Sequence, residues 1–310
     1  MRVLLTGSTG MVGRNVLEHP AAAQHEWLCP TRRELDLCDR AAVLAYMVKA
    51  RPDVVVHAAG KVGGIQANIA SPVAFLVENL DMGTNVVLAA ASGRVPRLLN
   101  LGSSCMYPKD HDEPLREELV LGGPLEPTNE GYAIAKCAVA RLCSYMARQD
   151  PELRYKTLIP CNLYGRWDSF DPVNSHMAPA VIRKLHEATQ RGATAVEVWG
   201  DGTARREFLY AGDLAACIQR CLVPAHFDAL PELMNVGLGH DHTVDDYYRA
   251  AATVVGYRGG YRHDPSKPSG MKRKLVAIDR QLAWGFRADT DLATGLRHTY
   301  QYFLEREQPR

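Results

Sequence analysis

The chain has 310 residues, of which 46% are apolar and 23% charged, as in a globular protein of one large domain or two closely joined ones. Its formal net charge of +1 gives no argument for a nucleic-acid or strongly acidic partner. No apolar run approaches the ~20 residues that a membrane helix needs, so we expect no membrane segment.

The chain begins with a short apolar run that Gly7 interrupts, which is too short for a signal peptide. Its eight cysteines include no Cys-x-x-Cys pair. Cys217 and Cys221 have the spacing of one helix face, but no further ligand stands near them in the sequence. We therefore expect buried free thiols, no metal site and a reducing cytoplasm.

The first predicted strand, Arg2–Thr6, runs into a glycine-rich turn, and a helical pattern follows from Arg14. In this Gly-x-x-Gly-x-x-Gly turn, the first glycine permits a tight bend and the second lets backbone amides approach a pyrophosphate. The third allows close packing of helix and strand. A plain turn is the alternative. We expect a dinucleotide to be held by the whole turn, namely Gly7, Ser8, Thr9, Gly10, Met11, Val12 and Gly13.

The stretch Trp27–Glu34 is expected to end the second strand. Proteins that bind NAD usually carry an acidic residue here for the ribose 2′-hydroxyl, but this chain has Arg32 and Arg33. A guanidinium suits a 2′-phosphate, so the sequence favours NADPH held by Arg32 over an arginine pair that is merely solvated. Asp36 and Leu37 then lie where the adenine would pack.

Strands and helices alternate through the next hundred residues. A buried strand within Arg51–Gly60 ends in Ala58 and Ala59, whose small side chains let the chain pass close to a cofactor. A helix is expected from Asn79 to Ala91, and a strand over Leu98–Gly102. This alternation predicts an α/β fold with a Rossmann-type, doubly wound parallel sheet and ligands at the carboxyl ends of its strands.

Polar side chains follow the strand that ends at Gly102. Ser103, Ser104 and Cys105 come directly after it, and Tyr132 and Lys136 share one face of an alanine-rich helix at i, i+4 spacing. In isolation such a Tyr/Lys pair is an ordinary surface pair. After a glycine-rich loop and a strand-end Ser-Ser, it predicts a reactive site.

Beyond Pro160 the pattern of parallel strands weakens. We expect residues 1–165 to form the cofactor-binding domain, with strand and helix returns from later segments. Residues 166–310 are expected to form mainly a smaller α/β substrate domain. Its expected helices and strands are Pro179–Gln190, Ala195–Trp199, Leu233–Gly237, Val244–Val255 and a helix that closes the chain.

With these motifs together, the sequence resembles the extended short-chain dehydrogenase/reductases, whose signature is a glycine-rich loop, a strand-end serine and Tyr-x-x-x-Lys. Further segments over nearly the whole chain are similar to the GDP-L-fucose synthase family. They are Lys61–Ile65, Gly102–Pro108, Glu126–Glu130, Tyr132–Lys136, Asn162–Gly165, Asn174–His176, Val198–Gly202 and Arg206–Phe208. The most specific features are Cys105 in Ser-Ser-Cys-Met-Tyr-Pro and His176 in Asn-Ser-His.

The resemblance implies one enzyme that is both isomerase and oxidoreductase. It would epimerise C3 and C5 of GDP-4-keto-6-deoxy-D-mannose and reduce C4 with NADPH, giving GDP-L-fucose. By resemblance, Cys105 and His176 are the acid/base pair, with His176 favoured as the base and Cys105 as the acid; a thiol and an imidazole titrate near enough to neutrality. A core thiol and an ordinary loop histidine are the alternatives.

The resemblance also implies which residues take part in the reduction at C4. Tyr132 would give the C4 oxygen its proton, and Lys136 would supply the cation that a phenol needs near neutral pH and hold the nicotinamide ribose. Ser103 would hydrogen-bond the carbonyl oxygen, with Ser104 in its place if the register differs by one.

The nucleotide-sugar is expected to contact several residues that match family positions: Asn162, Lys184, Trp199, Arg206 and Lys274. Cations suit a diphosphate and an indole offers a flat surface, although core packing is an equal alternative for Trp199. Some relatives carry arginine at the position of Lys184, and bulkier basic residues at Ser8 and Thr9, which leaves the 2′-phosphate mostly to Arg32. The family further implies a homodimer that pairs the helices around Asn79–Ala91 and Tyr132–Arg148 in a four-helix bundle.

Three alternatives stay open. A related enzyme would act on another GDP-4-keto sugar, such as a heptose or a dideoxy sugar. A non-catalytic sensor of NADP on the same fold commonly lacks the Tyr or the Lys, and this chain has both. An epimerase or dehydratase that recycles NAD would hold its cofactor without net consumption, and Arg32 argues against it.

Overall fold

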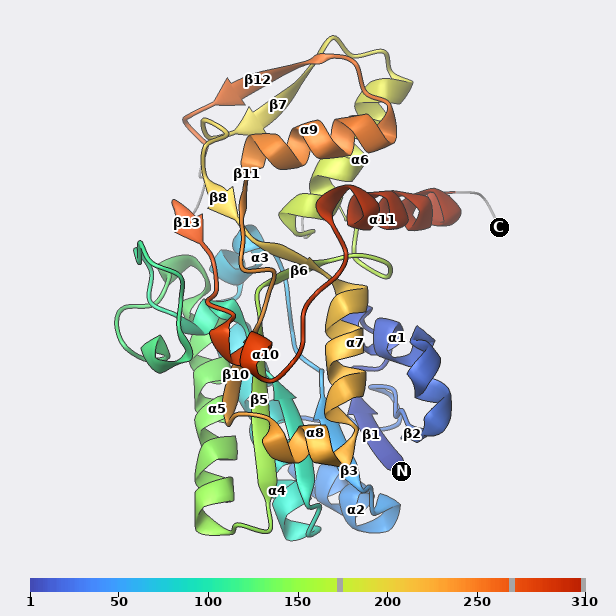
Figure 1. The fold of residues 1–310 in the computed structure, drawn as a ribbon, viewed down its shortest axis with the longest axis vertical. Helices are drawn as coiled ribbons and strands as arrows, with labels where there is room; N and C mark the ends of the chain where they lie inside the picture. The colour runs from blue at the N-terminus through green and yellow to red at the C-terminus, as the bar shows by residue number, and fades with distance from the viewer. Residues whose placement is uncertain (172–174, 268–270, 308–310) are drawn as a thin grey trace.

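A sheet of six parallel strands forms the centre of the computed structural model, which describes residues 1–171, 175–267 and 271–307 (Figure 1). The strands are β1 (Arg2–Thr6), β2 (Glu26–Leu28), β3 (Val54–His57), β4 (Arg97–Leu101), β5 (Arg154–Pro160) and β10 (Leu233–Val236). Their order in the sheet is β10-β5-β4-β3-β1-β2, and every neighbouring pair is parallel. The winding reverses between β1 and β3, which places a ligand crevice at the carboxyl ends of these two strands.

Helices cover both faces of the sheet because successive strand residues point in opposite directions. Val3 and Leu5 pack in one apolar cluster with residues of the first group of helices, and Leu4 packs in another with residues of the second. The first group is α1 (Met11–Glu18), α7 (Ala211–Cys221) and α8 (Pro224–Ala229). The second group is α2 (Arg40–Ala50), α4 (Pro72–Ser92) and α5 (Glu130–Gln149). The predicted doubly wound fold class is therefore confirmed.

A smaller α/β part lies beyond the carboxyl ends of the sheet and has its own apolar core (Figure 1). Its helices are α6 (Met177–Gln190), α9 (Val244–Val255) and α11 (Leu292–Glu307). Its strands pair as β7 (Ala195–Trp199) with β12 (Gly260–Asp264), and as β8 (Arg205–Arg206) with β11 (His242–Thr243) and β13 (Arg273–Lys274). Between the two parts, β6 (Asn162–Tyr164) pairs with β9 (Phe208–Tyr210).

The short helices α3 (Ile65–Ala70) and α10 (Asp279–Ala283) complete the connections. Because α7 and β10 follow the first half of the smaller part, the chain enters that part, returns to the sheet and enters it again (Figure 1).

Three sequence-based boundaries were wrong. Helix α1 begins at Met11 rather than Arg14, so the end of the glycine-rich segment lies inside the helix. The second strand ends at Leu28, so Arg32 and Arg33 lie in the following turn, where the amide of Glu34 donates to the carbonyl of Thr31. Helix α4 begins at Pro72 rather than Asn79, because a proline at the first helical position is pre-organised for helix.

Helix α4 is the one helix in the described ranges that is long and apolar enough to cross a membrane by length and composition. The expectation from sequence had missed it. Of that stretch, 44% is buried inside the protein, and α4 packs along α5 and α2. Packing within the fold therefore accounts for part of its apolar surface.

Candidate active site

The glycine-rich turn has the close backbone contacts that its sequence predicts. Gly7 has φ +71°, and a Cβ there would lie 2.7 Å from the amide nitrogen of Ala59. A Cβ on Gly13 would lie 2.3 Å from the carbonyl oxygen of Gly7. Gly10 precedes α1, and no side chain caps the first amides of this helix. The turn therefore leaves the amides of a helix N-terminus open to an anion at the crevice between β1 and β3.

The residues expected around the adenosine follow β2 in the chain. The Arg32 side chain is 79% exposed, and its Nη2 lies 4.0 Å from Oε2 of Glu78 on α4. Glu78 is held more closely by Lys61, whose Nζ lies 2.5 Å from Oε1. Asp36 accepts the amide of Cys38, and Leu37 is buried. Arg32 is thus accessible to a phosphate, but any such phosphate has to compete with the Glu78 carboxylate.

Three catalytic candidates meet at the carboxyl end of β4. The Ser103 side chain hydrogen-bonds Tyr132, and the Lys136 ammonium lies 5.7 Å from the centre of the Tyr132 ring. Lys136 is 7% exposed and donates to the carbonyl of Leu101 over 2.9 Å. Burial lowers the pKa of Lys136 to about 8. Burial raises the pKa of Tyr132, with a further contribution from Cys105, so the phenol keeps its proton at neutral pH.

Cys105 lies beside this group in a short 3-10 turn, Ser104–Met106. Its Sγ accepts from Nδ2 of Asn129 at 3.1 Å, and the Nζ of Lys274 lies 3.6 Å away. Lys274 belongs to β13 in the smaller part, so residues from both parts of the molecule meet at this sulfur. The sequence motif Glu126–Glu130 contains Asn129, but sequence reasoning gave this residue no role.

His176 precedes the first residue of α6, and its carbonyl accepts the amide of Ala180. Burial lowers the pKa of the His176 imidazole, which favours its neutral form. Within the described ranges, no hydrogen bond joins this imidazole to Cys105 or to Tyr132. Asn174, which belongs to the same motif, lies outside the described residues. The predicted Cys105–His176 pair therefore stays a prediction.

Two of the expected substrate ligands lie beside β7. Lys184 Nζ donates to the carbonyl of Glu197 at 2.9 Å and to the Tyr248 hydroxyl at 3.4 Å, so its ammonium ties α6 to β7 and α9. Trp199 is 46% exposed, and its Nε1 donates to the Glu197 carboxylate. Core packing therefore does not explain this indole.

The other expected ligands come together near β8. Arg206 and Lys274 are directly paired in the register of β8 and β13. Burial lowers the pKa of Arg206 from its ordinary value, and its Nη1 donates to the carbonyl of Arg205. Asn162 donates to the carbonyl of Glu207 in the neighbouring strand connection. Two cations on adjacent strands can bind an anion such as a diphosphate.

A buried carboxylate that sequence reasoning missed holds these strands in place. Glu207 is 1% exposed and accepts three backbone amides, from Leu238, Gly239 and Val276. Burial outweighs these bonds and raises the pKa of Glu207 to about 7. Because Val276 follows β13 and Leu238 follows β10, this carboxylate joins the strand that carries Lys274 to the edge of the main sheet.

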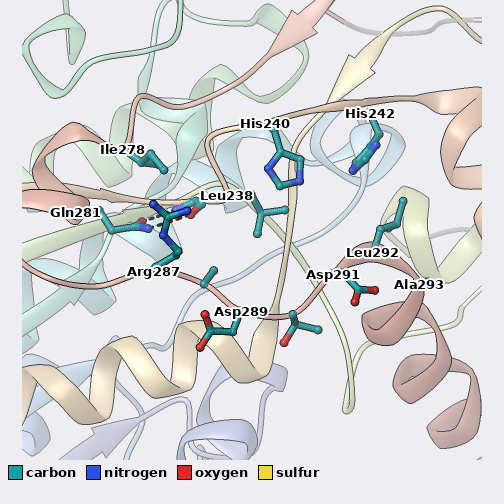
Figure 2. Close-up of a pocket in the computed structure, with 13 residues that line it drawn as sticks. Leu238, His240, His242, Ile278, Gln281, Arg287, Asp289, Asp291, Leu292 and Ala293 are labelled. Carbon is teal, nitrogen blue, oxygen red and sulfur yellow. Dashed lines mark hydrogen bonds between the residues drawn. The ribbon is translucent and has the colours of Figure 1, made fainter.

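A cavity of about 490 Å³ lies elsewhere, between the β10–β11 connection and the segment before α11. Figure 2 shows His240 and His242 on one side of it and Arg287, Asp289 and Asp291 on the other. None of the catalytic, cofactor-binding or substrate-binding residues predicted from the sequence lines this cavity. It is separate from the group around Cys105.

Comparison with known proteins gives the chain its relatives. A family model described as "NAD dependent epimerase/dehydratase family" matches residues 3–237. The chain is 50% identical over 304 residues to a GDP-L-colitose synthase from Yersinia pseudotuberculosis, covering 98% of both chains. It is 47% identical over 304 residues to a GDP-L-fucose synthase from Azorhizobium caulinodans, covering 98% of this chain and 96% of the relative.

Among solved structures, the fold is similar to that of a GDP-mannoheptose C4 reductase from Campylobacter jejuni, which was solved with NADP bound. The TM-score is 0.87 at 28% identity, and the match covers 98% of each chain.

Proposed function

The chain belongs to the NAD dependent epimerase/dehydratase family, and from that premise we propose that it is an NADPH-dependent epimerase/reductase of GDP-4-keto-6-deoxy-D-mannose, with GDP-L-fucose as its product. Family membership and the similarity to GDP-L-fucose synthases confirm the resemblance seen in the sequence. The observation that carries the proposal is the position of the Cys105 thiol beside Ser103, Tyr132 and Lys136 at the end of β4.

The glycine-rich turn fits a dinucleotide, because side chains on Gly7 or Gly13 would collide with neighbouring backbone and prevent the close turn that leads into the N-terminus of α1. We propose that this turn and the amides of α1 hold the pyrophosphate, and that Arg32 holds the 2′-phosphate of NADP. Ala58, Ala59, Asp36 and Leu37 would line the remainder of the site. NADPH, when bound, supplies the hydride that reduces C4.

Epimerisation requires a proton to leave a carbon next to the C4 carbonyl and another to return on the opposite face. As the proton leaves, its bonding electrons move to the C4 oxygen, where Ser103 stabilises the negative charge. Cys105 and His176 are the proposed acid/base pair. At each carbon, the group that starts without a proton acts as the base and the group that starts with one acts as the acid. In either assignment, the pair holds one proton before and after the step.

Reduction places a proton on the same oxygen. Tyr132 keeps its proton at neutral pH because burial raises its pKa, and it donates that proton as the oxygen gains negative charge. Lys136 lies beside the ring as a cation at neutral pH and stabilises the phenolate that remains. The nucleotide-sugar substrate is proposed to contact Asn162, Lys184, Trp199, Arg206 and Lys274.

The proposal is tested by NMR analysis of the product formed from NADPH and GDP-4-keto-6-deoxy-D-mannose in deuterium oxide. We expect GDP-L-fucose with deuterium at C3 and C5. Cys105→Ser and His176→Asn should each block this deuterium uptake. Wild-type uptake in both variants would overturn the assignment of the acid/base pair, and a product without inversion would overturn the proposed activity.

A second candidate substrate is another GDP-4-keto sugar, as the similarity to a GDP-L-colitose synthase suggests. A dideoxy sugar that lacks the C3 hydroxyl has only the C5 centre to invert. Comparing kcat/KM for this sugar and for GDP-4-keto-6-deoxy-D-mannose decides between the two. A ratio above about 100 in favour of either would identify it as the preferred substrate, a difference of roughly 2.7 kcal/mol in the transition state.

We also propose a cytoplasmic homodimer. Large apolar side chains are exposed on α4 and α5, with Val73 at 72%, Val77 at 45%, Ile134 at 43% and Tyr145 at 57%. A second copy of the same helix pair would cover them in a four-helix bundle. Val77→Glu should give a monomer in light scattering, whereas Leu282→Glu, which alters an exposed leucine on α10, should leave the dimer intact.

The two parts of the chain are proposed to bind different ligands. Residues 1–165, with the later returns to the main sheet, would bind the cofactor, and residues 166–310 would mainly bind the sugar nucleotide.

A further inference from the structure

The sulfur of Cys105 faces two N–H donors that come from distant parts of the chain. Asn129 lies 24 residues away and donates from Nδ2 at 3.1 Å, and Lys274 lies 169 residues away with its Nζ at 3.6 Å. Sulfur is a weak acceptor as a neutral thiol and a much better one as a thiolate. Two donors, one of them a cation, therefore fit a sulfur that carries negative charge during its working cycle.

We propose that Asn129 and Lys274 are positioning residues that aim Cys105 and stabilise its thiolate during epimerisation. This inference rests on the proposed function. In one direction, the thiolate takes a proton from the carbon beside C4, forming an S–H bond and an enolate. In the other, the thiol gives its proton to the enolate carbon and becomes a thiolate. Either direction has one state with negative charge on sulfur, which the two donors stabilise.

The surroundings of Asn129 support a fixed orientation of its amide. Its Oδ1 is buried without a hydrogen-bond partner among the described residues, while its Nδ2 is used by Cys105. Among the described residues, the side-chain amide of Asn129 therefore has the sulfur of Cys105 as its hydrogen-bond partner.

The position of Lys274 depends on contacts between the two parts of the molecule. Its strand pairs with β8, and the next residues are held by the Glu207 carboxylate through the amide of Val276. The resemblance seen in the sequence implies that Lys274 contacts the nucleotide-sugar. Without substrate no such contact exists, so the reactivity of Cys105 then reports only the contact between Lys274 and the sulfur.

The test measures alkylation of Cys105 by iodoacetamide in the full-length protein without substrate, quantified by peptide mass spectrometry. Cys38, which is also partly exposed, serves as the internal reference. Because the thiolate is the nucleophile, Lys274→Met and Asn129→Asp should each slow alkylation of Cys105 about five- to tenfold and leave Cys38 unchanged. Lys274→Arg keeps the charge and should stay within about twofold of wild type.

Lys272→Met is the matched control, since it removes the same charge from an exposed position two residues before Lys274. It should leave the alkylation rate of Cys105 unchanged. The inference is overturned if Lys274→Met alkylates Cys105 at the wild-type rate, if Lys272→Met slows it equally, or if Cys105 and Cys38 change together. That last result would report a general loosening of the structure.

A second measurement separates the inference from the proposed activity. Oxidation of GDP-L-fucose by NADP reports hydride transfer without epimerisation, so Asn129→Asp should retain this rate within about threefold while losing most deuterium uptake. If no GDP-4-keto sugar reacts with the wild-type protein, the proposed function fails, and the alkylation result still decides whether the two donors act on Cys105. Equal loss of both reactions would overturn the positioning role.

Discussion

The crossing of α4 and α5 depends on the missing side chain of Gly83. A Cβ at Gly83 would lie 2.3 Å from Cγ2 of Val139 and 2.9 Å from its Cγ1. Ordinary contact begins at 3.4 Å, so Gly83→Ala forces the two helices about 1.1 Å apart or distorts both side chains. Overpacking of this severity costs about 3 kcal/mol, and alanine recovers about 1 kcal/mol through helix propensity. We expect a net loss of about 2 kcal/mol.

A double-mutant cycle with Val139→Ala tests this reasoning. Val139 is 2% exposed, and its truncation alone should cost about 2 kcal/mol. In the double variant, the alanine methyl at position 83 enters the space that the valine leaves. The total cost should therefore stay near 2 kcal/mol instead of the sum of about 4 kcal/mol, a coupling of about 2 kcal/mol.

The assay is urea denaturation at fixed protein concentration, with the free energy of unfolding compared among the four proteins. Activity gives a second readout, because α5 also carries Tyr132 and Lys136, and Lys136 donates to Leu101 of β4. Gly83→Ala should lower kcat, and the double variant should recover it. Additive costs, or a Gly83→Ala protein as stable as wild type, would refute the close-packing explanation.

Three further predictions follow from charged groups. Burial lowers the pKa of Lys136 to about 8, so its cation is lost as pH rises through that value, and the rate of reduction in a pH–rate profile should fall above pH 8. Arg32→Ala should weaken NADPH binding about tenfold and leave NADH binding unchanged in a fluorescence titration, and equal loss for both would contradict its role at the 2′-phosphate. Glu207→Gln loses the acceptor for the Val276 amide and should cost about 1–3 kcal/mol in urea denaturation. The pKa of Glu207 is raised from its ordinary value of 4.5 to about 7 in the folded protein. Its protonation therefore contributes stability that is fully present below pH 4.5. That contribution is lost as pH rises to about 7, and Glu207→Gln should abolish this pH dependence.

Local patterns were sufficient to predict much of the fold. The strand Arg2–Thr6 and the helix Val244–Val255 have the predicted bounds, because hydrophobic periodicity and end signals act over neighbouring residues. The Gly-x-x-Gly-x-x-Gly spacing likewise predicted the turn, since the steric need for glycine at Gly7 and Gly13 is set within a few residues and one adjacent strand.

Where the sequence-based prediction missed a feature, the side chain contacts a residue from another segment of the chain. The sequence predicts a helix start at Asn79, but this residue lies inside α4. Its side-chain amide forms hydrogen bonds with the backbone N–H and carbonyl of Lys61. The contact between Arg32 and Glu78 of α4 was also not predicted, and the role of Arg32 at the 2′-phosphate stays a prediction. Neither contact leaves a periodic signal in the sequence.

By itself, the sequence determined the class of sheet and the position of the glycine-rich turn, and it predicted a set of candidate reactive groups, because each depends on residue type and short spacing. Only the tertiary structure decided which groups touch Cys105. Lys274 reaches the sulfur because β13 pairs with β8 and Glu207 holds the next residues against the main sheet. A contact that spans 169 residues is set by packing between two parts of the molecule, and no local pattern specifies it.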